Sequence, residues 1–348
     1  MSILENSHRH RSVMLAVIHL YVETAEPVGS RTLVKHYDFD LSPATVRNVM
    51  ADLEDEGYLI APHTSAGRIP TEMAYRYYVD EILKARALQA EGSQQVREEL
   101  LSYQGSVDEL ARRTSRVLSN LSSYAGVVLA PNRLHSTFKK VNFIRIKLGV
   151  VLVILVSRSG ITENRLIKMD QDFSQEALEN MSGYLNDRYG GLPLAQMRKR
   201  LADDMRRDKE NYDLLMNAAL ELGKKMLDSE SNTDVYVEGS SKILDFPEFT
   251  GNIEYMRQLF KTFEEKSNLV AILDETMDAE GLTVYIGSEV GISGVKGVSL
   301  VTSTYGNGDV TLGTVGIIGP TRMNYSEVIP LVRTAASTLS ENLAKEGL

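Results

Sequence analysis

The stretch from Leu41 to Leu59, LSPATVRNVMADLEDEGYL, determines one helix more firmly than any other part of the chain. Ser42 can cap its first turn, and Pro43 suits the first helical position because it has no N–H to leave unbonded there. Gly57 can adopt the left-handed conformation that ends a helix. Between these signals, one stripe with helical spacing is predicted to pack on a core: Val46, Val49, Met50 and Leu53.

The opposite face of this helix carries short or hydrogen-bonding side chains: Ala44, Thr45, Arg47, Asn48 and Ala51. Most of them belong to its N-terminal half, where a recognition helix meets base edges. Four acidic residues occupy the last turns: Asp52, Glu54, Asp55 and Glu56. A helix that enters a DNA groove by its N-terminal end can keep these carboxylates away from the phosphates. Their position near the helix C-terminus opposes the helix dipole, so helix stability alone does not explain it.

The flanking segments predict a winged helix-turn-helix. Helices are expected over Arg9–Thr24 and, with Ser30 as N-cap, over Arg31–Tyr37. After Gly57, Tyr58–Pro62 is typical of a strand, His63–Gly67 of a turn, and Arg68 begins a returning strand. Arg68 is expected near the wing tip, within reach of a minor groove or a phosphate.

Six side chains are candidate DNA contacts: Arg31, Ser42, Thr45, Arg47, Asn48 and Arg68. The net charge of the segment is less favourable for DNA binding, since Met1 to Arg86 contains nine Lys or Arg against twelve Asp or Glu. A single copy with few phosphate contacts would bind weakly, so a homodimer on an inverted repeat of double-stranded DNA is expected. A winged helix that binds only other proteins remains an open alternative.

Two runs in this segment resemble a known family. They are EPVGSRTLVKHYDFDLSPATVRNVMADLEDEGYL from Glu26 and HTSAGRIPTEMAYRYYVD from His63. They are similar to the N-terminal domain of the bacterial heat-inducible transcription repressor HrcA family. The resemblance implies repression of chaperone operons through an inverted-repeat operator, with feedback from the chaperonin GroEL. It also implies a GAF-like domain that holds an inserted dimerisation domain.

The whole chain is predicted to be an α+β protein made of several segments. Residues 1–85 form the winged helix-turn-helix domain and end in a helix from Glu72 to Lys84. Residues 86–105 are a partly helical linker with few packing residues. The resemblance implies that residues 106–172 and 229–348 form the GAF-like domain and that 173–228 form the inserted helical dimerisation domain. The insert has two apolar stripes, one of Leu194, Met197 and Leu201 and one of Leu215, Ala218, Leu222 and Met226. They favour an interface, although packing on the sheet is the alternative.

Regular alternation or apolar runs predict the strands of residues 106–348. They are Ala125–Ala130, Val141–Leu148, Val150–Val156, Val235–Glu238, Leu269–Leu273, Leu282–Ile286, Val298–Thr304 and Val310–Ile318. GNGD, residues 306–309, is typical of a hairpin turn between the last two. A closing helix is expected around Val328, Val332, Ala335, Leu339 and Leu343.

Several functional classes are disfavoured. The chain has no cysteine, which excludes disulfides and thiolate chemistry and fits a cytoplasmic protein. Its most apolar run, Val150–Val156, is far shorter than the ~20 residues of a membrane span, and MSILENSHRHRS lacks the apolar core of a signal peptide. The six histidines have no metal-binding spacing, and Gly291, Gly294 and Gly297 match no phosphate loop. No enzyme, cofactor, metal or membrane function is expected.

Three functions remain in view. The first is a dimeric DNA-binding repressor of heat-shock operons modulated by chaperonin. The second is a repressor controlled by a small molecule in its GAF-like domain, and the third is a winged-helix interaction module without DNA.

Overall fold

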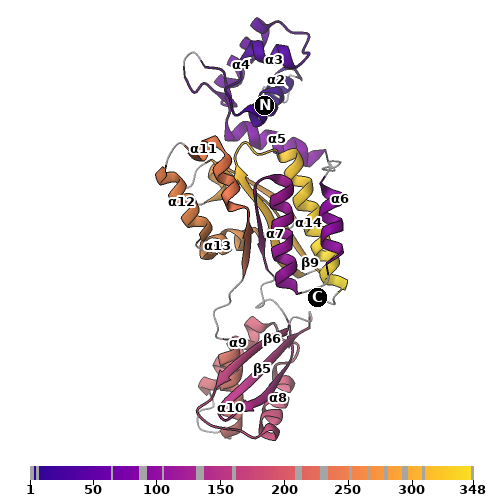
Figure 1. The fold of residues 1–348 in the computed structure, drawn as a ribbon, viewed down its shortest axis with the longest axis vertical. Helices are drawn as coiled ribbons and strands as arrows, with labels where there is room; N and C mark the ends of the chain where they lie inside the picture. Colours follow the sequence, from indigo (N-terminus) through magenta and orange to yellow (C-terminus); the bar gives the residue numbers. More distant parts are fainter. Residues whose placement is uncertain are drawn as a thin grey trace. The chain divides into compact units, whose positions relative to one another are not determined.

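The computed structural model describes residues 4, 8–63, 66–85, 92–103, 106–130, 137–158, 162–207, 214–227, 234–250, 253–264, 266–277, 281–291, 297–307 and 310–345. Helices and strands are mixed throughout, so the protein is α+β (Figure 1). The chain forms two compact units. Unit 1 comprises Met1–Val128, Val235–Tyr305 and Thr314–Thr338, and unit 2 comprises Leu129–Asp234, Gly306–Gly313 and Leu339–Leu348.

Unit 1 begins with an N-terminal region of helices and a small hairpin. Its elements are α2 (His8–Thr24), α3 (Ser30–His36), α4 (Pro43–Asp55), β1 (Leu59–Ile60), β2 (Ile69–Pro70) and α5 (Glu72–Lys84). β1 and β2 pair antiparallel, and Val28 adds a bridge to Arg68. The expected helices are confirmed, with one difference: Ser30 lies inside α3, whose N-cap is Gly29.

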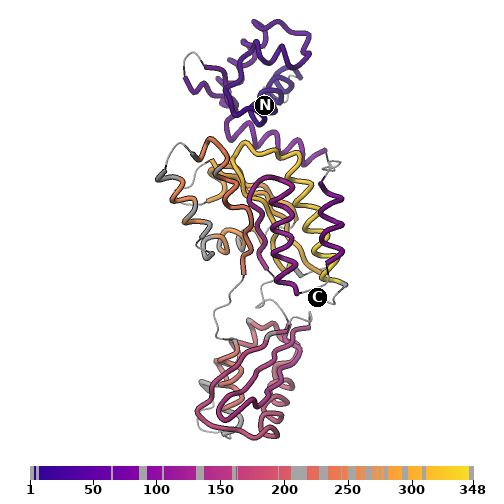
Figure 2. Tube along the Cα trace, viewed as in Figure 1, coloured from indigo at the N-terminus to yellow at the C-terminus, as the bar shows by residue number. Residues whose placement is uncertain are grey.

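The second part of unit 1, the sheet region, contains a five-stranded sheet in the order β7-β3-β10-β9-β8. These strands are β3 (Ala125–Leu129), β7 (Val235–Glu238), β8 (Leu282–Ile286), β9 (Val298–Asn307) and β10 (Val310–Pro320). Strands distant in sequence are therefore neighbours, as β3 and β10 are in Figure 2. The helical elements are α6 (Ser93–Leu101), α7 (Val107–Ser122), η2 (Ser240–Asp245), α11 (Pro247–Thr250), α12 (Ile253–Glu264), α13 (Lys266–Met277), η3 (Gly287–Val290) and α14 (Tyr325–Lys345).

Helix α7 lies directly against β3. Ser106 caps α7 by accepting a hydrogen bond from the Glu109 N–H. Ser115 Oγ donates to the Gly126 carbonyl at 2.7 Å. A Cβ at Gly126 would lie 2.1 Å from the Ser115 carbonyl oxygen, so only glycine permits this approach.

Two expectations for this region need correction. The predicted linker, 86–105, is partly helical, as expected, since it contains α6, but Val96 and Leu100 of α6 are fully buried, so the segment packs on its surroundings more than expected. The predicted strand Leu269–Leu273 is part of helix α13. Leu269 and Leu273 are both buried and four residues apart, which suits a helix face, and a short apolar run does not distinguish the two structures.

Unit 2 contains a three-stranded antiparallel sheet, β4-β5-β6, and three helices. Its elements are β4 (Phe138–Lys147), β5 (Val150–Ser157), β6 (Thr162–Lys168), α8 (Gln175–Tyr189), α9 (Leu194–Arg207) and α10 (Leu214–Leu227). The sequence places 106–172 with the flanking domain and starts the insert at Phe173. The structure differs, because β4, β5 and β6 form a sheet of their own and belong to the same compact unit as α8, α9 and α10.

The helices of unit 2 cover one face of this sheet. The shared core contains Val141, Phe143, Val151, Val153 and Leu155 from the strands. From the helices it contains residues of both stripes named above: Leu194, Met197, Leu201, Ala218, Leu222 and Met226. The Leu215 side chain lies outside the described residues. The stripes pack inside the chain, so the prediction that they form an interface is wrong.

Candidate nucleic-acid interface

Helix α4 has the structure that its end signals predict. Ser42 Oγ accepts a hydrogen bond from the Thr45 N–H at 3.1 Å, Pro43 is the first residue, and Gly57 has φ of +81°. The predicted stripe of Val46, Val49, Met50 and Leu53 is buried. Ala44, Arg47, Asn48 and Ala51 are exposed and Thr45 is half-buried. The polar face of α4 therefore faces solvent.

A groove of about 380 Å³ brings three of the six predicted contact residues together. Arg31 contributes from α3, Arg47 from α4 and Arg68 from the segment before β2. The groove is also lined by Val28, Gly29, Ser30, Met50, Ala66 and Gly67. Among these described lining residues every charged side chain is an arginine, although the surrounding segment is acidic.

The other predicted residues have different positions. The hydroxyls of Ser42 and Thr45 lie 3.0 Å apart at the start of α4, where Ser42 serves the cap. Asn48 is exposed on α4 but does not line the groove. Of the turn expected between the strands, Thr64 and Ser65 lie outside the described residues.

Arg68 lies at the turn end of the hairpin, directly before β2, as the Ile60–Ile69 pairing shows. Its backbone exchanges hydrogen bonds with Val28, at 2.9 Å and 2.8 Å. Its guanidinium donates from Nε to Glu54 Oε2 at 2.7 Å and its Nη2 lies 2.7 Å from the same oxygen. The side chain of Arg68 is half-buried, so it is held in a fixed position beside α4.

Two of the four acidic residues at the end of α4 have cationic or titratable partners. Glu54 pairs with Arg68, and Asp52 Oδ2 lies 3.2 Å from His10 Nε2 of α2. Asp55 and Glu56 are exposed at the C-terminal end of the helix. The contact of Glu54 with Arg68 was not expected from the sequence. The sequence does not indicate this contact, because it depends on where the hairpin that carries Arg68 lies against α4.

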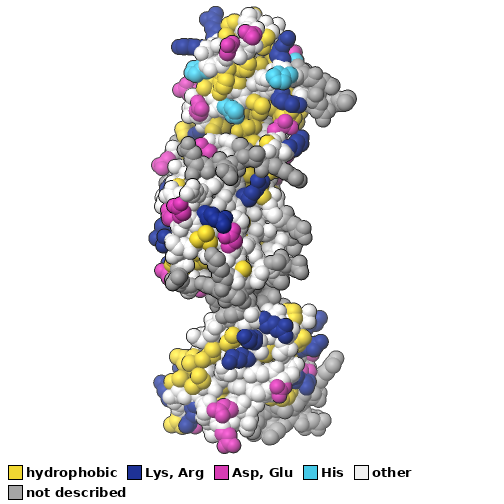
Figure 3. Space-filling view, turned by 90° about the vertical axis from the view of Figure 1, so that its right-hand side faces the viewer, with side chains coloured by type: hydrophobic (Ala, Val, Ile, Leu, Met, Phe, Trp, Pro, Cys, Tyr) yellow, Lys and Arg dark blue, Asp and Glu magenta, His cyan; other side chains and the backbone are white. Residues whose placement is uncertain are grey.

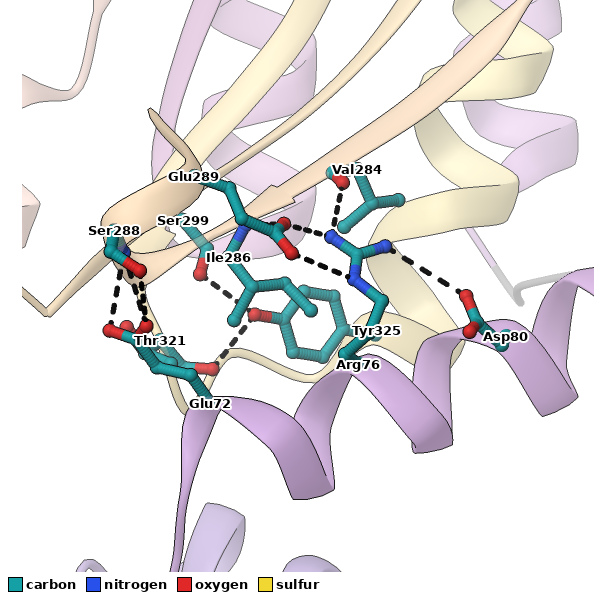
Figure 4. A network of polar contacts seen from close by, with 10 residues as sticks. All are labelled: Glu72, Arg76, Asp80, Val284, Ile286, Ser288, Glu289, Ser299, Thr321 and Tyr325. Atoms are coloured by element: carbon teal, nitrogen blue, oxygen red, sulfur yellow. Dashed lines mark hydrogen bonds and ion pairs between the residues drawn. The ribbon is translucent and has the colours of Figure 1, made fainter. Parts of the chain in front are cut away.

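Helix α5 ties the N-terminal region to the sheet region (Figure 4). Glu72 Oε2 accepts a hydrogen bond from Ser288 Oγ at 2.7 Å. Arg76 forms an ion pair with Glu289 and donates to the Val284 carbonyl at 2.7 Å. A Cβ at Gly287, which has φ of +55°, would lie 1.9 Å from Glu72 Oε1. These contacts attach α5 to the η3 segment and to β8.

Unit 2 has a second surface of interest, the outer sheet face, formed by the side of β4, β5 and β6 that its helices do not cover. Leu152 of β5 pairs with Ile144 of β4 and Leu166 of β6 across this face. Ile144 is 38% and Leu166 64% exposed. Ile154 and Val156 continue the face along β5. Figure 3 shows hydrophobic side chains gathered on the surface of unit 2, in the lower part of the view.

The described residues contain no group of three or more His, Asp or Glu side chains placed to hold a metal ion. In the same part of the chain, no helix is long and apolar enough to cross a membrane.

Comparisons with known proteins agree with the expected family. Residues 108–329 match the model of the HrcA protein C-terminal domain. The heat-inducible transcription repressor HrcA of Geobacter sulfurreducens is 44% identical over 340 residues, which cover 98% of this chain and 99% of the relative. The repressor HrcA of Syntrophobacter fumaroxidans is 41% identical over 343 residues, 98% of each chain. A crystal structure of a hypothetical protein shares the fold, with a TM-score of 0.64 and 21% identity over 98% of this chain and 99% of its own.

Proposed function

The chain belongs to the HrcA family of heat-inducible transcription repressors, and on that premise we propose that its N-terminal region is a winged helix-turn-helix that binds operator DNA through α4. Membership makes the protein a negative regulator of heat-shock genes. The observation that carries the proposal is the groove of Arg31, Arg47 and Arg68 beside the exposed polar face of α4. Guanidinium groups are suited to phosphates and to guanine edges.

Within this interface the roles differ. Arg47 and Asn48 are exposed on α4 and are proposed to contact bases, with Thr45 at the same end. Arg31 and Arg68 flank α4 and are proposed to contact phosphates. Ser42 positions the helix start through its cap, and its backbone and hydroxyl lie where a phosphate can approach a helix N-terminus.

We propose that the protein acts as a homodimer joined through the outer sheet face of unit 2. Strand β5 is apolar on both sides, since Val151, Val153 and Leu155 enter the core and Leu152, Ile154 and Val156 lie on the outer face. A strand that is apolar on both sides is typical of one buried on both sides. A second copy of the same face would complete that burial, and two copies match an inverted-repeat operator.

The remaining assignments follow the family. The sheet region is proposed to be the GAF-like domain, and unit 2 is proposed to be the inserted dimerisation domain, extended to include β4, β5 and β6. The protein is proposed to work in the cytoplasm on double-stranded DNA, without catalysis or a metal.

Chaperonin feedback is proposed to act on the same dimer. Helix residues such as Leu194, Leu201 and Leu222 are buried in the core of unit 2, so mild heating need not expose them first. Dissociation of the dimer would expose Ile144, Leu152 and Leu166 without any unfolding. An open apolar surface of this kind is what a chaperonin such as GroEL binds. Capture and release of this species would restore the operator-binding dimer.

A gel-shift experiment tests the proposal. Purified protein is titrated against an inverted-repeat operator and against a scrambled duplex of the same composition. Specific retention of the operator is expected, and equal affinity for both duplexes would contradict it. The same titration after mild heating, with and without chaperonin and ATP, tests the feedback. Full recovery of operator binding without chaperonin would exclude a chaperonin requirement.

Control by a small molecule is the second candidate function. It is favoured by a cavity in unit 1 whose walls come from both the N-terminal region and the sheet region.

A further inference from the structure

The two edges of the sheet of unit 2 differ. The sheet has the order β4-β5-β6, so β4 and β6 each have one side without a neighbouring strand (Figure 1). Such a side presents unpaired N–H and C=O groups and readily pairs with another strand, so proteins usually block it. Unit 2 blocks the edge of β4, whereas the side of β6 away from β5, the open edge, is not blocked in this way.

Helix α8 blocks the edge of β4 with side chains. Asn186 Oδ1 accepts a hydrogen bond from the Val141 N–H at 2.6 Å, and its Nδ2 donates to the Val141 carbonyl at 3.0 Å. Ser182 Oγ accepts from the Phe143 N–H at 3.0 Å, and Gln175 Nε2 donates to the Phe143 carbonyl at 3.2 Å. The backbone groups of Val141 and Phe143 are therefore used within the unit.

These bonds also determine which backbone groups of β6 point outward. Phe143 directs its N–H and C=O away from β5, and in an antiparallel pair the opposite residue does the same. Val153, opposite Phe143, therefore bonds to β6, where its partner is Arg165. Because the direction alternates along a strand, Asn164 and Leu166, on either side of Arg165, direct their N–H and C=O groups to the open edge.

The open edge of β6 lacks a partner among the described residues. In that part of the chain, nothing bonds to the outward backbone groups of Asn164 and Leu166. Both side chains are exposed, Leu166 to 64%. Arg165 is half-buried on the helix side of β6 and has no ion pair with another described residue. The edge therefore offers main-chain groups and a cation to a partner strand.

The sequence of β6, TENRLIK, is complementary to itself. An acidic residue, Glu163, precedes Asn164 and a basic residue, Arg165, follows it. When two copies of β6 lie antiparallel about a twofold axis at Asn164, position 163 of each copy is opposite position 165 of the other. Opposite charges at facing positions stabilise a strand pair, and like charges destabilise it. A pairing centred on Arg165 would instead place two arginines opposite each other, so the charges select the axis at Asn164.

We propose that β6 pairs antiparallel with β6 of a second copy of the chain, in the register centred on Asn164. The outward groups of Asn164 and Leu166 then complete a ladder, and the sheets of the two copies become one continuous sheet. This contact goes beyond the proposed homodimer, because it uses the open edge and leaves the outer sheet face free. The two contacts together join homodimers into closed tetramers. A pair of strands alone is only marginally stable in water, so the edge contact is expected between homodimers at raised concentration rather than between monomers.

Disulfide cross-linking tests the register, since the chain has no cysteine of its own. Asn164→Cys places a thiol at the proposed axis, where facing Cα atoms of a hydrogen-bonded antiparallel pair are about 5.5 Å apart, within the reach of a disulfide. Mild oxidation of the full-length protein at rising concentration is expected to link two copies. Asn180→Cys, on the exposed side of α8, is the control and is expected to stay unlinked. Absence of linkage in the Asn164→Cys protein overturns the proposal.

Charge reversal separates the open edge from the outer sheet face, because positions 163 and 165 belong to the helix side of β6. In the Asn164→Cys protein, Arg165→Glu places glutamates opposite each other and is expected to slow linkage about tenfold. Addition of Glu163→Arg returns opposite charges to both facing positions and is expected to restore the rate. Linkage that is insensitive to Arg165→Glu, or that the second change does not restore, overturns the edge pairing.

Sedimentation velocity shows which copies the contact joins. The unaltered protein is expected to pass from dimer to tetramer as its concentration rises, and Arg165→Glu is expected to remain dimeric. A protein that stays dimeric at every concentration, with Arg165→Glu equally dimeric, overturns the edge contact. A monomer–dimer equilibrium that Arg165→Glu abolishes would instead support the edge contact and contradict the homodimer through the outer sheet face. Because these readouts contain no DNA, their failure leaves the proposed operator binding untouched.

Discussion

Helix α4 and the sheet of unit 2 each bury one face in the core of their own unit and leave the other uncovered. The uncovered face of α4 is polar, with Arg47 and Asn48 in solvent, whereas the uncovered face of the sheet has an apolar centre around Leu152, with Ile144 and Leu166 in solvent. A polar face is stable in water and can meet its partner intermittently. A cluster of exposed apolar side chains commonly marks an interaction site. The first is suited to reversible DNA binding and the second to a lasting contact between copies.

The two faces also differ in the forces that they supply. Arginine contacts to DNA release counterions and weaken steeply with salt. Apolar burial is largely indifferent to salt and produces a negative heat-capacity change on binding. Substitutions on the two faces are therefore expected to change different measurements: oligomeric state for the sheet, and DNA affinity and its salt dependence for α4.

The largest effect is expected for Leu166→Glu on the outer sheet face. A carboxylate within the apolar part of the proposed interface has no cation facing it from a second copy of the same cluster, so the variant is expected to be monomeric by light scattering. Because each monomer then engages only one half-site, operator affinity is expected to fall by about 10²- to 10⁴-fold. Asn180→Glu, on the exposed side of α8, adds the same charge elsewhere in unit 2 and is the control. A Leu166→Glu protein that stays dimeric would place the interface on another surface.

A smaller effect is expected for Arg47→Ala on the polar face of α4. Removal of the guanidinium is expected to weaken specific operator binding by about 1 to 3 kcal/mol without changing the dimer or the unfolding temperature. Competition titrations against operator and scrambled DNA measure it. Unchanged affinity in the folded variant would move base recognition away from α4.

Sequence patterns were sufficient for α4 and insufficient for unit 2, for a physical reason. In α4 the cap at Ser42, the stop at Gly57 and the stripe between them are local, so burial and exposure follow from the helical period. In unit 2 the same kind of stripe, Leu194 to Leu201, gives no information about what it packs against. It packs on the sheet of its own unit.

The candidate site shows the same limit. Arg31 and Arg47 could be chosen from the sequence because each is an exposed cation on a predicted helix. The partnership of Arg68 with Glu54 depends on how the hairpin returns to α4, and the pairing of Arg76 with Glu289 joins residues 213 positions apart. Side-chain pairs of this kind depend on tertiary structure and have no periodic signal.

A still smaller effect is expected for Arg68→Ala. Arg68 lies beside α4 and is already paired with Glu54, so its loss is expected to lower affinity equally for all duplexes and to reduce the salt slope by about 1. Because the ion pair between Arg68 and Glu54 is partly exposed, it is expected to contribute no more than about 1 kcal/mol to the free energy of unfolding. Glu54→Gln is the matched variant: it frees Arg68 and is expected to increase nonspecific affinity. A change in base preference at one operator position would instead make Arg68 a base contact.

The smallest expected effect is a pH response confined to the N-terminal region. Within the described residues every histidine lies there, and His19 of α2 has its Nε2 3.2 Å from Tyr78 Oη of α5. Burial lowers the pKa of His19 below its usual 6.5, and nearby Glu23 opposes this only in part. The folded state therefore favours the neutral ring, so this contribution to stability is present above pH 6.5 and is lost as the pH falls toward the lowered pKa. Hydrogen exchange is expected to quicken in α2 and α5 between pH 7 and 5.5 and to stay constant in β4, β5 and β6 after correction for intrinsic rates. His19→Gln should flatten the response of α2 and α5, and an equally steep response in that variant would assign it to another group.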